Sequence, residues 1–244
     1  MKKVLLYSGG MDSWLISKIW NPDLKVYVNM HTRYSEEEIK RIKETEPDVQ
    51  IVDFPLGQWE RDDAIIPLRN LYLTMVMCNI TGSEDVEICL GATAGDRVLD
   101  KSPVFVKMAN ELLNYLYQPQ HWIPEGKRVK LNIDFKAKTK TELIKLFAEA
   151  GGDIKEAFNR SFSCYDPIDG HECWHCKPCF RKFVSFALNG MQFPKEVSNT
   201  VIAYIKKEIE PQIIAGTYGR AEEEKEIKAV LKLYEKEESN CNRL

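Results

Sequence analysis

The sequence has no long apolar run and no large excess of charge of either sign. No stretch approaches the ~20 apolar residues that a membrane-spanning helix needs. The apolar run near the start, Val4 to Tyr7, is shorter than the about 7–15 residues of a secretory signal, so we expect a cytoplasmic protein. Lys and Arg number 34 against 37 Asp and Glu, for a net charge of −3. General binding to a nucleic-acid backbone needs clustered cations, so we expect no direct nucleic-acid partner.

The composition is otherwise typical of a globular protein. Hydrophobic residues make up 44% of the 244 positions and charged residues 29%, which excludes a disordered chain, a collagen and a long coiled coil. The length alone suggests one or two domains. The sequence shows no internal repeat and no low-complexity linker.

The first half alternates short apolar segments with helical patterns. We expect strands at 3–7, 24–30, 49–54, 86–90 and 128–133, and helices at 13–20, 35–46, 67–80, 102–117 and from 139 to the glycine pair at 151–152. This alternation predicts an α/β fold with a doubly wound, parallel, five-stranded sheet covered by helices on both faces. Such sheets bind ligands at the carboxyl ends of their strands.

Three local patterns predict where helices begin. Ser35 with Glu38, and Thr139 with Glu142, have the spacing of capping boxes. Pro67 suits the first turn of the helix that follows it.

From residue 161 the pattern changes to a cysteine cluster and helices expected at 178–188, 195–208 and 220–238. We therefore expect two domains, a nucleotide-binding α/β domain over 1–160 and a zinc-binding helical subdomain over 161–244. In the last helix an apolar stripe is expected to pack on the rest of the protein rather than on a partner; it comprises Ile227, Val230, Leu231 and Tyr234. The charged tail from residue 235 is expected to fray.

A glycine turn follows the first strand directly. The segment runs Tyr7, Ser8, Gly9, Gly10, Met11, Asp12, Ser13. Two glycines let the backbone turn sharply and approach a ligand, and the helix that follows offers free N–H groups and the positive end of its dipole. Asp12 would repel a phosphate unless a cation intervenes, which suggests Mg²⁺. The Gly-Lys-Ser/Thr of the Walker pattern is missing.

The turn resembles the PP-loop of the ATP pyrophosphatase superfamily. The resemblance implies ATP binding by Tyr7 to Ser13, with Asp12 and Ser13 as catalytic residues. Members of that superfamily typically transfer AMP to a carbonyl or carboxyl oxygen, pyrophosphate leaves, and a nucleophile then displaces AMP.

Four cysteines lie within sixteen residues of one another: Cys164, Cys173, Cys176 and Cys179. Two overlapping C-x2-C spacings with one cysteine upstream suit a structural Zn²⁺ site. An iron–sulfur cluster with Cys164 as the fourth ligand remains an alternative. His171 and His175 could each replace one thiolate, but we expect them beside the site.

The glycine turn and the cysteines belong to a wider pattern. The other segments of this pattern are Pro67-Leu68-Arg69-Asn70, Gly91 to Asp96, Lys140 before Glu142-Leu143-Ile144, Ser163-Cys164-Tyr165, and Cys173-x2-Cys176-x2-Cys179-x-Arg181. Together they resemble the 7-cyano-7-deazaguanine synthases, from about Val4 to Leu188. The last fifty or so residues match no motif. The resemblance implies an adenine-nucleotide α-hydrolase-like fold.

The resemblance also implies an activity in queuosine biosynthesis. The carboxylate of 7-carboxy-7-deazaguanine would be adenylated, and free ammonia would displace AMP to give the amide, since no glutaminase motif is present. A second activation would dehydrate the amide to the nitrile. Lys140 would be catalytic, and Arg69, Asn70 and Asp96 would bind substrate. ATP and Mg²⁺ would be required, Zn²⁺ would be structural, and a homodimer is expected.

One segment departs from the family pattern. The Tyr-Pro-Asp-Cys-Arg stretch that usually follows the loop aspartate is missing after Asp96. A divergent member could stop at the amide or activate another base. Two other classes stay open: a tRNA-thiolating PP-loop enzyme, which iron with sulfide would indicate, and a nucleotide-binding defence module, which would release no pyrophosphate.

Overall fold

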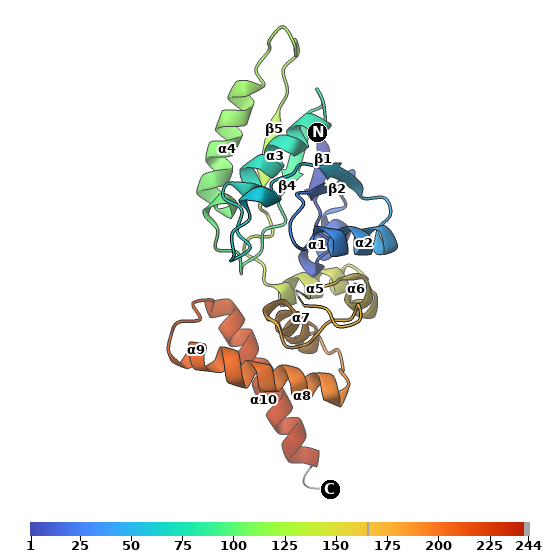
Figure 1. The fold of residues 1–244 in the computed structure, drawn as a ribbon, viewed down its shortest axis with the longest axis vertical. Coiled ribbons are helices and arrows are strands. Elements are labelled where there is room, and N and C mark those ends of the chain that lie inside the picture. The colour runs from blue at the N-terminus through green and yellow to red at the C-terminus, as the bar shows by residue number, and fades with distance from the viewer. Residues whose placement is uncertain (165, 242–244) are drawn as a thin grey trace. The chain divides into compact units, whose positions relative to one another are not determined.

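The computed structural model describes residues 1–164 and 166–241, with residues 236–241 described by their backbone alone. It divides into two compact units, Met1–Ala137 and Lys138–Leu244, and each is considered by itself (Figure 1). Tyr165, part of the cysteine segment's resemblance, lies outside the described residues. The tail expected to fray begins at residue 235; its backbone continues the helix α10 (Ala221–Cys241) as far as Cys241, and residues 242–244 lie outside the described residues. Fraying of this tail stays a prediction.

The first unit is built on five parallel strands. They are β1 (Lys2–Leu6), β2 (Leu24–Asn29), β3 (Gln50–Asp53), β4 (Val86–Cys89) and β5 (Val129–Asn132), in the order β3-β2-β1-β4-β5. Every expected strand is confirmed to within one residue at each end. Val4 of β1 pairs with Leu24 on one side and Ile88 on the other, so β1 is the central strand. The chain leaves β1 toward β2 and returns to β4 on its other side, which places the topological switch at β1.

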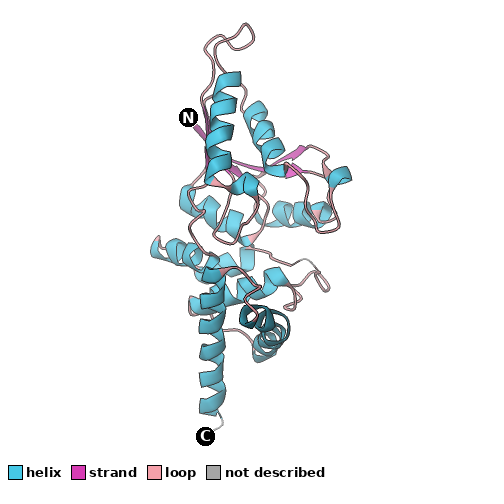
Figure 2. Ribbon diagram, turned by 90° about the vertical axis from the view of Figure 1, so that its left-hand side faces the viewer, coloured by secondary structure: helices cyan, strands magenta, loops and turns pink. Residues whose placement is uncertain are grey.

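Helices cover both faces of this sheet, whose strands are magenta in Figure 2. Four of them are α1 (Met11–Trp20), α2 (Ser35–Thr45), α3 (Arg69–Ile80) and α4 (Pro103–Leu116). Val4 and Val26 share a buried apolar cluster with residues of α3 and α4. Successive side chains of a strand point to opposite faces, so Lys25 points the other way, where it meets Glu46 at the end of α2. The doubly wound α/β fold is therefore confirmed.

The predicted capping box at the start of α2 is wrong. Tyr34 already has helical angles, with φ −104° and ψ −9°, so Ser35 lies inside the helix. The Ser35 hydroxyl accepts the Thr32 N–H at 2.9 Å, while Glu38 accepts the Tyr27 hydroxyl at 2.7 Å. Both side chains therefore bond residues that precede the helix, and neither caps the backbone N–H groups of its first turn.

The predicted position of Pro67 in the first turn of a helix is also wrong. α3 begins at Arg69, and Leu68 before it has a left-handed backbone with φ 59°. The Asn70 N–H, one of the orphan donors of the first turn, donates to Asp100 Oδ2 at 3.1 Å. The carboxylate of Asp100, thirty residues further along the chain, therefore satisfies a donor at the start of this helix, and Pro67 lies outside it.

The second unit is helical. Its elements are α5 (Lys140–Glu149), α6 (Ile154–Arg160), α7 (Lys177–Leu188), α8 (Lys195–Tyr204), a π-helical segment Ile205–Ile209, α9 (Glu210–Ile214) and α10 (Ala221–Cys241). Asn189 Nδ2 donates to Thr141 O at 3.1 Å, and α5 packs against α7. The division between units therefore lies before α5, earlier than the expected boundary at residue 160. The functional roles expected for the two domains stay predictions.

The apolar stripe of α10 packs inside the second unit, as expected. Ile227, Val230 and Leu231 are buried in one cluster with Phe180 and Phe183 of α7, and Tyr234 packs against that cluster. No helix among the described residues has the length and apolar character to cross a membrane.

Candidate nucleotide and metal sites

The glycine turn lies at the carboxyl end of the central strand. Gly9 has φ +73°, and a Cβ there would lie 3.0 Å from Ile42 Cγ1 of α2. A side chain at this position would therefore be strained and crowded. Gly10 is the N-cap residue just before α1, and no side chain among the described residues caps that helix start. The turn thus presents backbone N–H groups at the positive end of α1, which suits an anion.

Two serines fix the shape of this turn. The buried Ser13 hydroxyl donates to Gly10 O at 3.0 Å and accepts the Ser8 N–H at 3.2 Å. The two hydroxyl oxygens are 3.3 Å apart. Ser13 therefore orders the loop, while Ser8 remains exposed to a ligand.

The loop after β4 begins at Gly91, whose φ is +62°. Asp96 Oδ2 accepts the Thr93 N–H at 2.9 Å and pairs with Lys101 Nζ at 3.2 Å. Lys136 Nζ donates to the carbonyl oxygens of Thr93 and Asp96. Asp96 thus closes its own loop, and its expected contact with substrate stays a prediction.

Arg69 and Asn70 occupy the first turn of α3. Burial raises the pKa of Glu38, and the Tyr27 hydroxyl and the positive charge of Arg69 oppose that rise. Arg69 therefore lies within electrostatic reach of the partly buried carboxyl group of Glu38 on α2. Asn70 is almost fully buried. Their roles toward substrate remain predictions.

Lys140 is the first residue of α5. The predicted capping box before it is confirmed: Glu142 N–H donates to Thr139 Oγ1 at 3.2 Å, and Thr139 N–H donates to Glu142 Oε2 at 2.8 Å. Lys140 belongs to the second unit, while Asp12 and Asp96 belong to the first. Their expected roles in one reaction stay predictions.

The four cysteines converge in the second unit. Their sulfur atoms all lie within 4.8 Å of one another, with Cys173 and Cys179 Sγ 4.0 Å apart. Ligands 2.3 Å from a tetrahedral Zn²⁺ would be separated by ~3.8 Å, so the arrangement fits a zinc ion with little movement. His175 Nδ1 lies 2.7 Å from Cys173 O. Among the described residues, the cluster that could hold a metal contains no histidine.

Without a bound cation, the thiols of this cluster resist ionisation. Burial raises the pKa of Cys173 to about 12, and the neighbouring Cys176 together with burial raises the pKa of Cys179. Thiols packed together without a positive charge resist ionisation. A bound Zn²⁺ would supply that charge and favour the thiolates.

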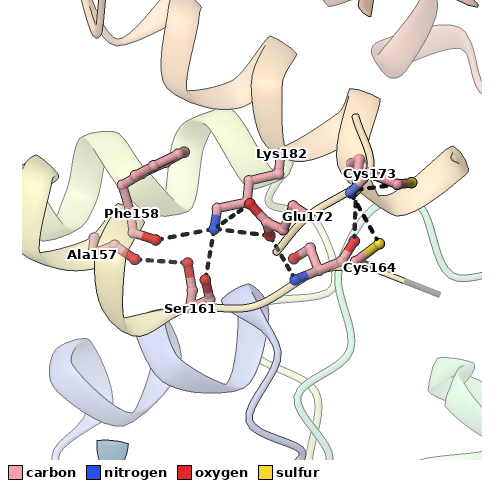
Figure 3. A network of polar contacts seen from close by, with 9 residues as sticks. Ala157, Phe158, Ser161, Cys164, Glu172, Cys173 and Lys182 are labelled. Carbon is pink, nitrogen blue, oxygen red and sulfur yellow. Dashed lines mark hydrogen bonds and ion pairs between the residues drawn. The ribbon is translucent and has the colours of Figure 1, made fainter. Parts of the chain in front are cut away.

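The sequence prediction missed two residues beside this cluster. Lys182 and Glu172 form a buried ion pair with Nζ–Oε1 at 3.0 Å, shown in Figure 3. Glu172 directly precedes Cys173, and Lys182 follows Cys179 by about one helical turn. The position of charged Glu172 next to the predicted ligand Cys173 was the feature of the sequence that could have identified this pair.

Comparisons with known proteins point to one family. The model of the family described as queuosine biosynthesis protein QueC matches residues 45–190. The 7-cyano-7-deazaguanine synthase of Rickettsia africae is 24% identical over 229 residues, covering 79% of this chain and 97% of the relative. That of Paramagnetospirillum magneticum is 23% identical over 230 residues, covering 80% and 98%. That of Saccharolobus solfataricus is 25% identical over 134 residues, covering 54% of this chain and 26% of the relative.

The family match includes the cysteine cluster, Arg69, Asp96 and Lys140, while the glycine turn precedes it. The match spans more than half of the chain, and the identities to the relatives are low. With its five-stranded parallel sheet and four-cysteine cluster, this chain belongs to the queuosine biosynthesis protein QueC family as a divergent member.

Proposed function

We propose that this protein is an ATP-dependent carbon–nitrogen ligase that converts 7-carboxy-7-deazaguanine and ammonia to 7-cyano-7-deazaguanine, or to the amide intermediate. The observation that carries the proposal is the uncapped start of α1 behind Gly9 and Gly10, at the switch point of the sheet, in a chain of this family. The curated relatives are named 7-cyano-7-deazaguanine synthases, which supports the choice of product.

The proposed reaction proceeds through two activations. A carboxylate oxygen attacks the α-phosphorus of ATP, the bond between the α- and β-phosphates breaks, and pyrophosphate leaves. Ammonia then attacks the acyl carbon, the bond to the AMP oxygen breaks, and nitrogen loses a proton. A second ATP activates the amide oxygen in the same way. Departure of AMP and loss of the two remaining N–H protons leave the nitrile.

The residues of the first unit have distinct proposed roles. The N–H groups at the start of α1 and the Ser8 and Ser13 hydroxyls would stabilise the leaving pyrophosphate. Asp12 would hold Mg²⁺, which when bound neutralises charge on the phosphates. Arg69 is a proposed cation for the substrate carboxylate or the phosphates.

Lys140 of the second unit is the other proposed cation, while Asn70 and Asp96 are proposed to contact the base. The four cysteines would hold a zinc ion that stabilises the second unit and takes no part in bond making.

The test is an incubation of the purified protein with ATP, Mg²⁺, ammonium and 7-carboxy-7-deazaguanine, with mass analysis of the products. We expect AMP, pyrophosphate and the amide or nitrile, and no ATP cleavage when neither a heteroaromatic carboxylate nor its amide is present. Formation of ADP, or AMP formation without the base, would contradict the proposed chemistry.

A further inference from the structure

The buried Lys182 of α7 makes an unusually complete set of hydrogen bonds. The Lys182 side chain is 2% exposed although it carries a charge. Its ammonium donates to Phe158 O at 3.0 Å, to Ser161 O at 2.6 Å and to both carboxylate oxygens of Glu172, at 3.0 and 3.1 Å. A buried charge is tolerated when it is paired and fully hydrogen-bonded, and Lys182 meets both conditions.

The carboxylate of this pair reaches a further segment. Glu172 Oε1 accepts the Ser163 N–H at 2.9 Å, one residue before Cys164. Glu172 itself is bonded to Cys173, whose N–H donates to Cys164 Sγ at 3.4 Å. Figure 3 shows the Lys182 ammonium group between Phe158, Ser161 and Glu172, with the contact between Cys173 and Cys164 to one side. One ion pair therefore joins the stretch that carries Cys164, the stretch that carries Cys173, and the helix that carries Cys179.

We propose that Lys182 and Glu172 are positioning residues that hold Cys164 and Cys173 in metal-binding geometry before a metal arrives. The inference rests on the proposal that the four cysteines bind a metal. Ligands from separate segments must be ordered before they can share one ion, and ordering a chain is entropically unfavourable. Here the fold does that ordering, since the pair ties down the backbone on both sides of the cluster. Residues that orient metal ligands typically change metal affinity 10–100-fold when replaced.

A neighbouring ion pair provides a matched control. Arg181 lies next to Lys182 on α7, and its Nε lies 3.0 Å from Glu223 Oε2 of α10. Both side chains are largely buried. Glu223 also accepts a hydrogen bond from the Tyr218 hydroxyl and forms an ion pair with Arg220. This pair ties α7 to the C-terminal helix, so its loss should lower stability without disturbing the segments that carry Cys164 and Cys173.

The test compares Lys182→Met, the double variant Lys182→Met/Glu172→Leu and the control Glu223→Gln in the full chain. The double variant removes both charges, so it keeps no unpaired buried charge and should fold even where the single variant does not. The rate of zinc loss to a chelator is measured at a temperature where circular dichroism shows each protein folded. The spectrum of the Co²⁺-substituted protein reports on ligand geometry.

We expect the double variant to lose zinc at least ~10-fold faster than the wild type, with an altered Co²⁺ spectrum, and Glu223→Gln to stay within ~2-fold. Wild-type retention in the double variant would overturn the inference, and so would equal effects in the double variant and the control. A wild-type protein that binds no metal would remove its basis. Zinc binding without AMP formation would contradict the proposed reaction while leaving this inference in place.

Discussion

Ser13 both orders the glycine turn and has a proposed role in catalysis. Its hydroxyl joins Gly10 O to the Ser8 N–H and is held near the Ser8 hydroxyl. We expect Ser13→Ala, and likewise Asp12→Ala, to lower ATP turnover at least ~100-fold with the fold intact, because the lost contacts stabilise charge in the transition state. Pyrophosphate release measures this effect.

Ser17 is the control for that experiment. It lies one helical turn further along α1, is also buried, and donates to Trp14 O at 2.6 Å within its own helix. Ser17→Ala should therefore keep turnover close to that of the wild type. Normal turnover in both Ser13→Ala and Asp12→Ala would contradict the PP-loop assignment.

Two lysines of α5 allow a comparison between a charge with a proposed function and a charge exposed to solvent. Lys145 is 69% exposed and lies 3.9 Å from Glu149, as expected of a lysine that faces water. Lys140 begins the helix behind the Thr139 cap. Lys140→Ala should weaken AMP formation at least ~10-fold, since a cation near the substrate carboxylate offsets its repulsion from the phosphates. Lys145→Ala is the control, and equal rates in the two variants would remove Lys140 from the proposed site.

At the scale of elements, one carboxylate joins three of them. Glu46, just after α2, accepts the Trp14 Nε1–H of α1 at 3.1 Å and pairs with Lys18 of α1 at 3.0 Å and with Lys25 of β2. Burial alone would raise the pKa of Glu46, but the hydrogen bonds from Lys25 and Lys18 outweigh it and hold the pKa below the usual 4.5. The ionised form is therefore favoured in the folded protein.

The pH dependence of stability follows from that direction. A lowered folded-state pKa contributes stability above the unfolded-state value, and this contribution is lost as the pH falls through the folded-state pKa. Glu46→Gln should lower the free energy of unfolding by roughly 2 kcal/mol at pH 7, with the difference from the wild type shrinking below about pH 4. Urea unfolding at pH 7 and below about pH 4 measures the free energy of unfolding of both proteins. Glu36→Gln, at an exposed position of α2, is the control and should have little effect. A constant difference across this range would contradict the assignment.

For the molecule as a whole, we expect the amount of bound zinc to determine thermal stability. We expect close to one zinc per chain, held by the four cysteines. Cys176 is the N-cap residue just before α7. Cys176→Ser should lower zinc content and melting temperature together, because metal binding at a structural site contributes to folding. Elemental analysis and thermal unfolding measure both, and stoichiometric iron with acid-labile sulfide would instead favour a tRNA-thiolating enzyme.

Much of this architecture could be predicted because its causes are local. Apolar runs bounded by turn residues predicted all five strands, and a tight C-x2-C spacing predicted that Cys173, Cys176 and Cys179 would converge. The helix expected over 195–208 instead becomes π-helical from Ile205 and continues as α9. Pro211 lies just beyond that segment and has no N–H to donate to the turn before it, which favours a change of helical pitch there.

The five strands, the glycine turn and the cluster of cysteines could be predicted from the sequence alone, because each depends on a pattern of residues that are close along the chain. The partners of Ser35 and Glu38, the contact of Asp100 with the first turn of α3, and the Lys182–Glu172 pair instead depend on how the folded chain packs. In each of these a polar group has several possible partners, and the one it takes is brought near by packing of distant segments. Lys182 reaches Phe158 and Ser161 across more than twenty positions, a distance over which a local pattern carries no information.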